Sequence, residues 1–160
     1  MNAEKKSYTF DEIRLKMAAY CSYQDRCHSE VEQKMRDFLL IPEARDEILL
    51  FLLRENFLNE ERFTRSYIRG KFNIKHWGRN KIRQHLKQKG VSEKLISRCM
   101  DEIDCQEYQK VLKKTYHQYF SSLKGKGLKE YQKNVKTTRY LLSRGFEYDE
   151  IREVIAEEAE

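Results

Sequence analysis

A ten-residue pattern that recurs 55 residues later constrains this chain more than any other feature. Residues 81–90 (KIRQHLKQKG) and 136–145 (KTTRYLLSRG) each carry a Leu four positions before a Gly and a basic residue directly before it. An apolar residue follows each Gly, and an Ile stands six positions after it. A fainter copy begins at Glu30, about 51 residues upstream. Recurrence at such a period is typical of tandem structural units.

Each unit reads as three helices, because start and stop signals divide the chain into about nine amphipathic segments. Thr9, Asn59 and Ser92 suit N-caps, whereas Gly90 and Gly145 suit helix stops. One Pro and six Gly are too few for a turn-rich β-sandwich. We therefore predict an all-α fold of three tandem three-helix repeats that form an elongated, curved helical array. The predicted divisions are 1–58 (first repeat with an N-terminal extension), 59–104 (second, basic repeat) and 105–160 (third repeat with an acidic C-terminal end).

Helical spacing also predicts which side chains each unit buries. Phe63, Tyr67 and Ile74 share one face of the fourth helix. The apolar face of the eighth helix is expected to carry Leu128, Tyr131, Val135, Thr138 and Leu142. The tyrosines expected in the core or at its boundary are Tyr67, Tyr108, Tyr119 and Tyr131. For Trp77, packing in a joint between units is favoured over stacking on a base.

The basic residues are concentrated in two blocks. Residues 62–92 hold ten basic residues and no acidic one, and 108–146 hold ten with the single acid Glu130. A solvated helix normally carries both acidic and basic residues, because opposite charges one turn apart stabilise it. In a block without acids the positive charges repel one another, and a bound polyanion would relieve this repulsion. A basic face that binds nothing in particular remains the alternative. The predicted partner-binding and nucleic-acid-binding residues are Arg62, Arg65, Arg69, Lys71, Lys75, Arg79, Lys81, Arg83, Lys87, Lys89, Lys124, Lys126, Lys129, Lys133, Lys136, Arg139 and Arg144.

No motif predicts catalysis or a cofactor. The cysteines, at 21, 27, 99 and 105, form no CxxC, so reduced cytosolic thiols are favoured over a zinc site completed by a histidine. Glu60 and Glu61 suit the first turn of a helix better than acid–base chemistry. Residues 124–127 (KGKG) lack the spacing of a phosphate-binding loop. We expect a protein that is not an enzyme and holds no metal.

Targeting signals are also missing from the sequence. No apolar run approaches the roughly 18 residues of a membrane span. Residues 1–6 are polar and unlike a secretory signal peptide. We expect a cytoplasmic protein with no membrane partner.

Residues 55–69 (ENFLNEERFTRSYIR) resemble the signature of the RecX family. That signature runs in the order Gly or Asn, an apolar residue, Leu, Asp or Asn, an acid, Arg and Phe, and it leads into a helix that ends in basic residues. Residues 78–96 are similar to that family's second unit, and Arg144, Gly145, Phe146 and Ile151 are similar to its third. The resemblance extends over about residues 10–156. Cys27 stands where the family usually has a Ser N-cap.

The resemblance implies tandem three-helix units and a role in recombination, DNA repair and the SOS response. RecX-like proteins modulate RecA, the recombinase that forms filaments on single-stranded DNA. The expected function is to bind this filament as a monomer and to inhibit its ATPase and strand-exchange activities. Direct contact with single-stranded or double-stranded DNA is expected as well. Two alternatives stay open: a helix-turn-helix transcriptional regulator that reads duplex DNA with the helices flanking Gly90, and a structural adaptor.

Overall fold

The computed structural model describes residues 7–160, so the first six residues of the predicted N-terminal extension lie outside the described part. This part holds nine α-helices, one 3₁₀ turn and no strand. The elements are α1 (Phe10–Tyr23), α2 (His28–Met35), α3 (Pro42–Arg54), α4 (Glu60–Asn73), α5 (Arg79–Gln88), α6 (Glu93–Cys99), η1 (Met100–Glu102), α7 (Cys105–Ser122), α8 (Glu130–Ser143) and α9 (Tyr148–Ala159).

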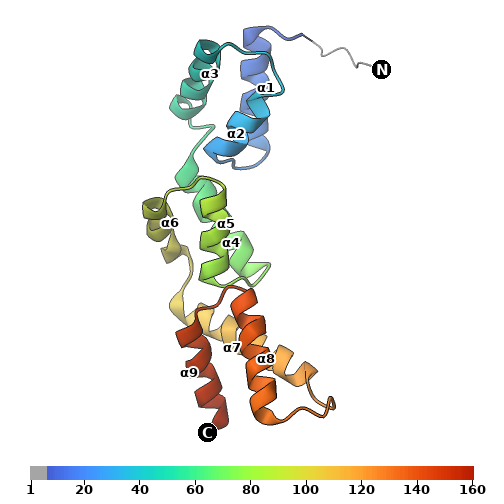
Figure 1. Ribbon diagram of the computed structural model, residues 1–160. Helices are drawn as coiled ribbons and strands as arrows, with labels where there is room; N and C mark the ends of the chain where they lie inside the picture. The colour runs from blue at the N-terminus through green and yellow to red at the C-terminus, as the bar shows by residue number, and fades with distance from the viewer. Residues whose placement is uncertain (1–6) are drawn as a thin grey trace, which may run out of the picture.

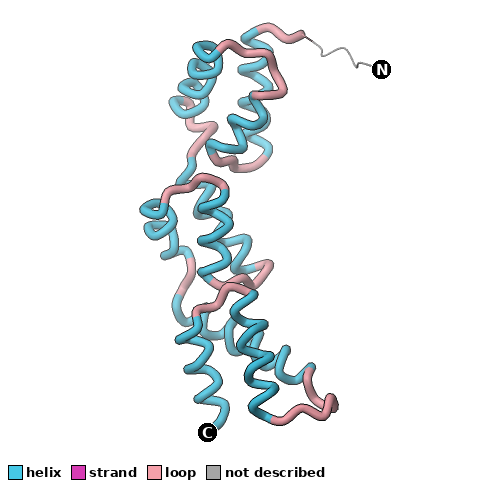
Figure 2. Tube along the Cα trace, viewed as in Figure 1, coloured by secondary structure: helices cyan, strands magenta, loops and turns pink. Residues whose placement is uncertain are grey.

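The helices form three successive groups of three along one long axis, α1–α3, α4–α6 and α7–α9, which we call units 1, 2 and 3 (Figures 1 and 2). This arrangement confirms the predicted all-α array of three-helix repeats. The exact boundaries after residues 58 and 104 stay predictions. None of the helices in residues 7–160 has the length and apolar character that crossing a membrane requires.

Local signals place most helix ends where the sequence predicts them. Thr9 Oγ1 accepts the Glu12 N–H at 3.2 Å, and Asn59 Oδ1 accepts the Arg62 N–H at 3.0 Å. Ser92 caps α6 in the same way, and Cys27 caps α2 without a side-chain hydrogen bond. The helix stops Gly90 and Gly145 adopt φ values of +84° and +96°. Because these φ values favour glycine, the repeat fixes a Gly at the end of the second helix of units 2 and 3.

Two hydrophobic cores hold the three units. Unit 1 has a core of its own, built around Met17, Val31, Ile48 and Leu52. Units 2 and 3 share one continuous core that includes Ile82, Leu86, Ile96, Tyr108, Leu141, Phe146 and Ile151. Cys27, from unit 1, is fully buried in this second core. Units 2 and 3 are therefore one packed body, to which unit 1 is attached through the start of α2.

Helices α8 and α5 stack end to end. The Gly78 N–H donates to Arg144 O at 2.8 Å, and the Asn80 N–H donates to Gly145 O at 2.9 Å. The first N–H groups and last carbonyls of a helix have no partner within that helix, so each end satisfies the other. The two helix dipoles also align head to tail, which is favourable.

The end of α5 likewise meets the start of α2, but at this joint side chains form the hydrogen bonds that backbone groups form between α8 and α5. Ser29 Oγ donates to Lys89 O at 2.7 Å, and Lys89 Nζ lies 3.0 Å from Glu30 Oε1. Alongside this joint, Arg62 Nε lies 2.6 Å from Asp25 Oδ1. Helices α8, α5 and α2 thus follow one another along the long axis of the molecule (Figure 1).

Two of the predicted buried faces are wrong. Ile74 is exposed because α4 ends at Asn73. In α8, Tyr131, Val135 and Leu142 are exposed, whereas Thr137 and Leu141 are buried. The Thr137 hydroxyl donates to Lys133 O at 2.7 Å, which satisfies its polar group inside the core. The more polar face of α8 is therefore the one that packs.

We expect Gly78→Ala to lower the free energy of unfolding by about 2 kcal/mol, because it overpacks the α8–α5 joint. A Cβ at Gly78 would lie 2.3 Å from the Gly145 carbonyl carbon, which is backbone and cannot move aside. Urea denaturation followed by circular dichroism measures the change. The matched control is Gly70→Ala in α4, where an added Cβ meets nothing within 4 Å. That change should be neutral or stabilising by up to about 1 kcal/mol; equal effects at both sites would contradict the tight joint.

Candidate functional site

Carboxylates from other parts of the chain neutralise most of the basic block 62–92. Seven of its ten cations have an ion-pair partner in the fold. The pairs are Arg62–Asp25, Arg65 with Glu61, Asp101 and Glu102, Arg69–Glu102, Arg79 with Glu147 and Glu150, Arg83–Glu93, Lys87–Glu93 and Lys89–Glu30. The premise that the like charges of this block repel one another without compensation is therefore wrong. The fold brings carboxylates next to them that residues 62–92 themselves lack. The predicted role of each residue in binding stays a prediction.

Arg65 ties η1 to α4. Its Nη1 lies 2.7 Å from Asp101 Oδ1 and 3.1 Å from Glu102 Oε1, and its Nη2 lies 3.1 Å from Glu61 Oε1. These hydrogen bonds, Asp101 first, raise the pKa of Arg65 above its usual range. Hydrogen bonds from Arg69 and Arg65 lower the pKa of Glu102. A guanidinium that bonds three carboxylates is committed to the fold, and an anionic partner would have to displace them.

Arg79 holds the joint between units 2 and 3. Its guanidinium lies 3.8 Å from the centre of the Tyr108 ring, and its Nη1 lies 3.1 Å from Glu147 Oε2 and 3.3 Å from Glu150 Oε1. The Tyr108 hydroxyl donates to Glu147 Oε1 at 2.9 Å and accepts the Arg79 N–H at 3.1 Å. Burial, with Glu147 as a further cause, raises the pKa of Glu150 to about 7. Two carboxylates thus share one guanidinium at a half-buried position.

The remaining predicted cations have no carboxylate partner among the described residues. Arg144 donates to the backbone oxygen of Lys75, and Lys133 lies 5.8 Å from the Phe120 ring centre. The cations without an ion pair are Lys71, Lys75, Lys81, Lys124, Lys126, Lys129, Lys133, Lys136, Arg139 and Arg144. We call this set the unpaired cations. They lie in the last turn of α4, on the α4–α5 turn, on α5, on the α7–α8 loop, along α8 and just after it, so they belong to units 2 and 3.

Trp77 organises the unpaired cations nearest the α4–α5 turn. The ammonium groups of Lys71 and Lys81 lie 4.8 and 4.4 Å from its ring centre, and the His85 ring centre lies 4.7 Å away. The indole is half-buried against the shared core of units 2 and 3, as the packing interpretation predicts. Cation–π contact holds each ammonium without neutralising it. Two charges are therefore fixed on the surface and remain open to an anion.

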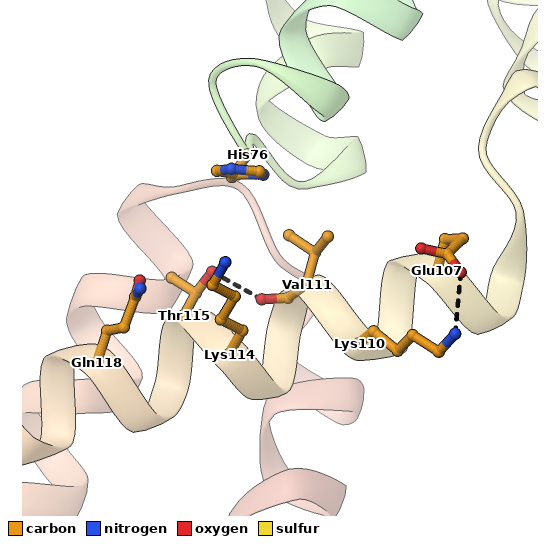
Figure 3. A pocket seen from close by; sticks show the side chains of 7 residues that line it. All are labelled: His76, Glu107, Lys110, Val111, Lys114, Thr115 and Gln118. Carbon is orange, nitrogen blue, oxygen red and sulfur yellow. Dashed lines mark hydrogen bonds and ion pairs between the residues drawn. The ribbon is translucent and has the colours of Figure 1, made fainter.

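A cavity of about 310 Å³ lies beside this turn, between His76 and α7 (Figure 3). His76 occupies the turn with a φ of +55°. The other lining residues are Glu107, Lys110, Val111, Lys114, Thr115 and Gln118. Lys110 Nζ lies 3.0 Å from Glu107 Oε1, whereas Lys114 is exposed and has no carboxylate partner within residues 7–160. Lys114 is not among the predicted binding residues. Its place beside His76 follows only from the packing of unit 3 against unit 2, which the local sequence does not show.

The cysteines form no cluster in the fold. Cys21, Cys27 and Cys99 are buried free thiols, and Cys105 is an exposed one. Burial raises the pKa of Cys21 and Cys99, so these two thiols are less reactive than an exposed cysteine. Residues 7–160 contain no group of three or more His, Cys, Asp or Glu side chains that could hold a metal ion.

Comparison with known proteins adds the family. The family model for "RecX, second three-helix domain" matches residues 59–100, and that for "RecX, third three-helix domain" matches 106–155. "Regulatory protein RecX" of Vibrio vulnificus is 30% identical over 138 residues, which span 86% of this chain and 87% of that protein. The chain belongs to the RecX family. "Regulatory protein RecX" of Vibrio parahaemolyticus is 34% identical over 110 residues, or 69% of this chain and 68% of that protein.

Other RecX proteins are longer. That of Streptococcus uberis is 29% identical over 136 residues, which are 84% of this chain and 51% of the relative, so the chain spans about half its length. The structure titled "Crystal structure of RecX from Lactobacillus salivarius" superposes with a TM-score of 0.84 over 92% of this chain and 95% of that one, at 23% identity. This likeness shows the RecX fold. These relatives are described as regulatory proteins.

Glu150→Gln should make the protein more stable at pH 8, because it removes a carboxylate whose charged form is disfavoured in the fold. The gain should be only about 1 kcal/mol, since water reaches part of this carboxyl and screens its repulsion with Glu147. Folding raises the pKa of Glu150 from 4.5 to about 7. The protonated carboxyl therefore favours the folded state below pH 4.5, and that contribution is lost as the pH rises through about 7. Urea denaturation at pH 5.5 and 8 measures the difference.

The control is Glu153→Gln, because Glu153 lies on the same helix, is exposed and has no ion pair with any residue in the described part of the chain. It should leave the pH dependence as in the wild type. A Glu150→Gln protein that loses stability between pH 5.5 and 8 as steeply as the wild type would exclude Glu150 as the group responsible.

Proposed function

We propose that this RecX-family protein binds the filament that RecA forms on single-stranded DNA and inhibits the filament's ATPase and strand-exchange activities. The observation that carries the proposal is the set of unpaired cations on units 2 and 3, in a chain whose relatives are described as regulatory proteins. Its place of action would be the cytoplasm.

Unpaired cations suit a phosphate backbone better than paired ones. A lysine without a carboxylate partner exchanges only water and counterions for a phosphate, and counterion release favours binding. A cation that leaves an ion pair must abandon its carboxylate next to the incoming phosphate, which costs free energy. We therefore assign the DNA-facing role to the lysines among the unpaired cations and a structural role to Arg65, Arg79 and the other paired residues.

The shape supports a partner that is itself extended. The three units lie along one axis, so a partner with repeating subunits could meet more than one unit at once. The joint that links the units depends on a left-handed Gly at a helix end, as at Gly90 and Gly145. Helix α2 ends at Met35 without such a residue, so copies of this chain are not suited to extend the stack. This supports binding as a monomer.

A helix-turn-helix regulator gains no support from the geometry. In that interpretation α6 would be the helix that reads the major groove. It has seven residues, and its first residue, Glu93, holds both Arg83 and Lys87. A carboxylate in that position would face the phosphates of the duplex.

The proposed function predicts that the protein lowers ATP hydrolysis by purified RecA on single-stranded DNA. The inhibition should weaken between about 50 and about 200 mM salt, because phosphate contacts weaken steeply with salt. A coupled ATPase assay and co-sedimentation with the filament measure the two effects. Unchanged hydrolysis together with no co-sedimentation at low salt would overturn the proposal.

Replacing unpaired lysines should weaken the interaction more than replacing paired ones. We expect Lys71→Gln, Lys75→Gln and Lys81→Gln together to reduce the slope of log affinity against log salt by about two for single-stranded DNA. Fluorescence anisotropy of labelled DNA measures this slope.

The matched control removes the same charge from three paired lysines, Lys34, Lys87 and Lys113, whose partners are Asp37, Glu93 and Glu157. This variant should keep most of the wild-type slope. If the two variants lose the same slope, net charge alone governs binding and the assignment of the unpaired cations is wrong.

A further inference from the structure

Unit 3 exposes a cluster of large apolar side chains. Tyr131, Val135 and Leu142 lie on one side of α8, at positions i, i+4 and i+11, and are 63%, 47% and 43% exposed. Tyr148, the first residue of α9, is 54% exposed. We call these four residues the α8–α9 patch. Helices α8 and α9 pack against each other, and the patch lies away from the buried Thr137 and Leu141.

The repeat shows what unit 2 has at the same place. A shift of 55 residues pairs Arg83 with Thr138, Lys87 with Leu142 and Glu93 with Tyr148. In unit 2 these positions form an ion cluster, in which Glu93 binds Arg83 and lies 2.6 Å from Lys87 Nζ. Leu142 and Tyr148 thus occupy the positions that the paired Lys87 and Glu93 hold in unit 2. Unit 3 therefore has apolar side chains in water where the same fold accommodates a charged cluster.

The exposure of these side chains is not required by the fold. Unit 2 shows that polar residues satisfy the same backbone, and neither α5 nor α2 has a large apolar residue among the exposed ones. Grouped exposed apolar residues mark interaction sites, and tyrosine is enriched at the centres of protein interfaces. The patch is thus a surface for a partner.

The chemistry of the patch fits a protein partner better than nucleic acid. Val135 and Leu142 offer nothing to a phosphate or sugar and cannot stack on a base as an aromatic ring does. Two cations border them. Arg139 lies one turn from both Val135 and Leu142, and the Arg152 guanidinium lies 5.8 Å from the Tyr148 ring centre. Neither arginine has a carboxylate partner among the described residues. A complementary surface would carry apolar side chains flanked by carboxylates.

We propose that the α8–α9 patch docks a segment of the protein component of the filament, one with apolar side chains and flanking carboxylates, while the unpaired lysines meet the DNA. This inference rests on the proposed function and divides it between two surfaces. Protein contact at the patch and phosphate contact at the lysines would then be separable by mutation.

The test uses the full chain with Leu142→Lys and Tyr148→Glu together. This double variant copies the Lys87–Glu93 pair of unit 2 and keeps the net charge, so the fold should be retained, as circular dichroism and thermal unfolding would verify. We expect about a tenfold or greater loss of affinity for the RecA filament on single-stranded DNA. Affinity for the bare DNA should stay within about twofold of the wild type. A second variant, Val135→Gln with Leu142→Gln, should behave in the same way.

The matched control is Leu50→Gln with Leu53→Gln on α3, because both side chains are exposed apolar residues outside the patch. It should bind the filament as the wild type does. Wild-type affinity of both patch variants for the filament would overturn the inference. An equal loss on bare DNA would assign the patch to nucleic acid, and a wild-type dimer that the variants abolish in analytical ultracentrifugation would assign it to a second copy; both outcomes overturn it. Failure of the wild type itself to bind the filament would instead overturn the proposed function.

Discussion

The end-to-end stacking of α8, α5 and α2 determines how the rest of the molecule is built. Each short helix leaves unpaired N–H groups at its start and carbonyls at its end, and the stack pairs them at the α8–α5 joint, as in the bond from the Gly78 N–H to Arg144 O. The remaining helices then pack beside this axis, so the core of units 2 and 3 is continuous. At the α5–α2 joint the contacts come largely from side chains such as Ser29 and Lys89, and unit 1 keeps a separate core. Units 2 and 3 are therefore joined more tightly to each other than unit 1 is joined to unit 2.

Features that depend on a few neighbouring residues could be predicted from the sequence. The caps at Thr9, Asn59 and Ser92 and the stops at Gly90 and Gly145 are local, because each bond spans a turn of helix. The repeat adds long-range information, since two similar segments predict two similar folds. Ion pairing could not be predicted in this way. Arg79 pairs with Glu147 and Glu150, which are 68 and 71 residues away in the sequence. The acid-free segment 62–92, taken alone, gives no sign of these partners.

The same limit explains the error on α8. Amphipathic patterns are ranked by how apolar each face is, and the face with Tyr131, Val135 and Leu142 is the more apolar one. The fold buries the other face, which carries Thr137 and Leu141. Thr137 can enter the core at little cost because its hydroxyl donates a hydrogen bond within its own helix. A residue-by-residue hydropathy scale counts threonine as polar and does not register that its hydroxyl is already hydrogen-bonded one turn back. The segment-by-segment comparison of 81–90 with 136–145 contains the correct answer, since Leu86 and Leu141 occupy the same position and both are buried.

Ion pairing also separates structure from function among the basic residues. Arginines dominate the paired group, and their fixed forks bond several carboxylates at once, as Arg65 does with Glu61, Asp101 and Glu102. Lysines dominate the unpaired group, and their hydrated ammonium groups adapt to phosphates whose positions vary along a flexible strand. Ion pairs within the fold thus engage seven of the seventeen predicted cations. Units 2 and 3 thus carry both unpaired lysines and an exposed apolar patch, and a partner that contains both DNA and protein can satisfy both at once.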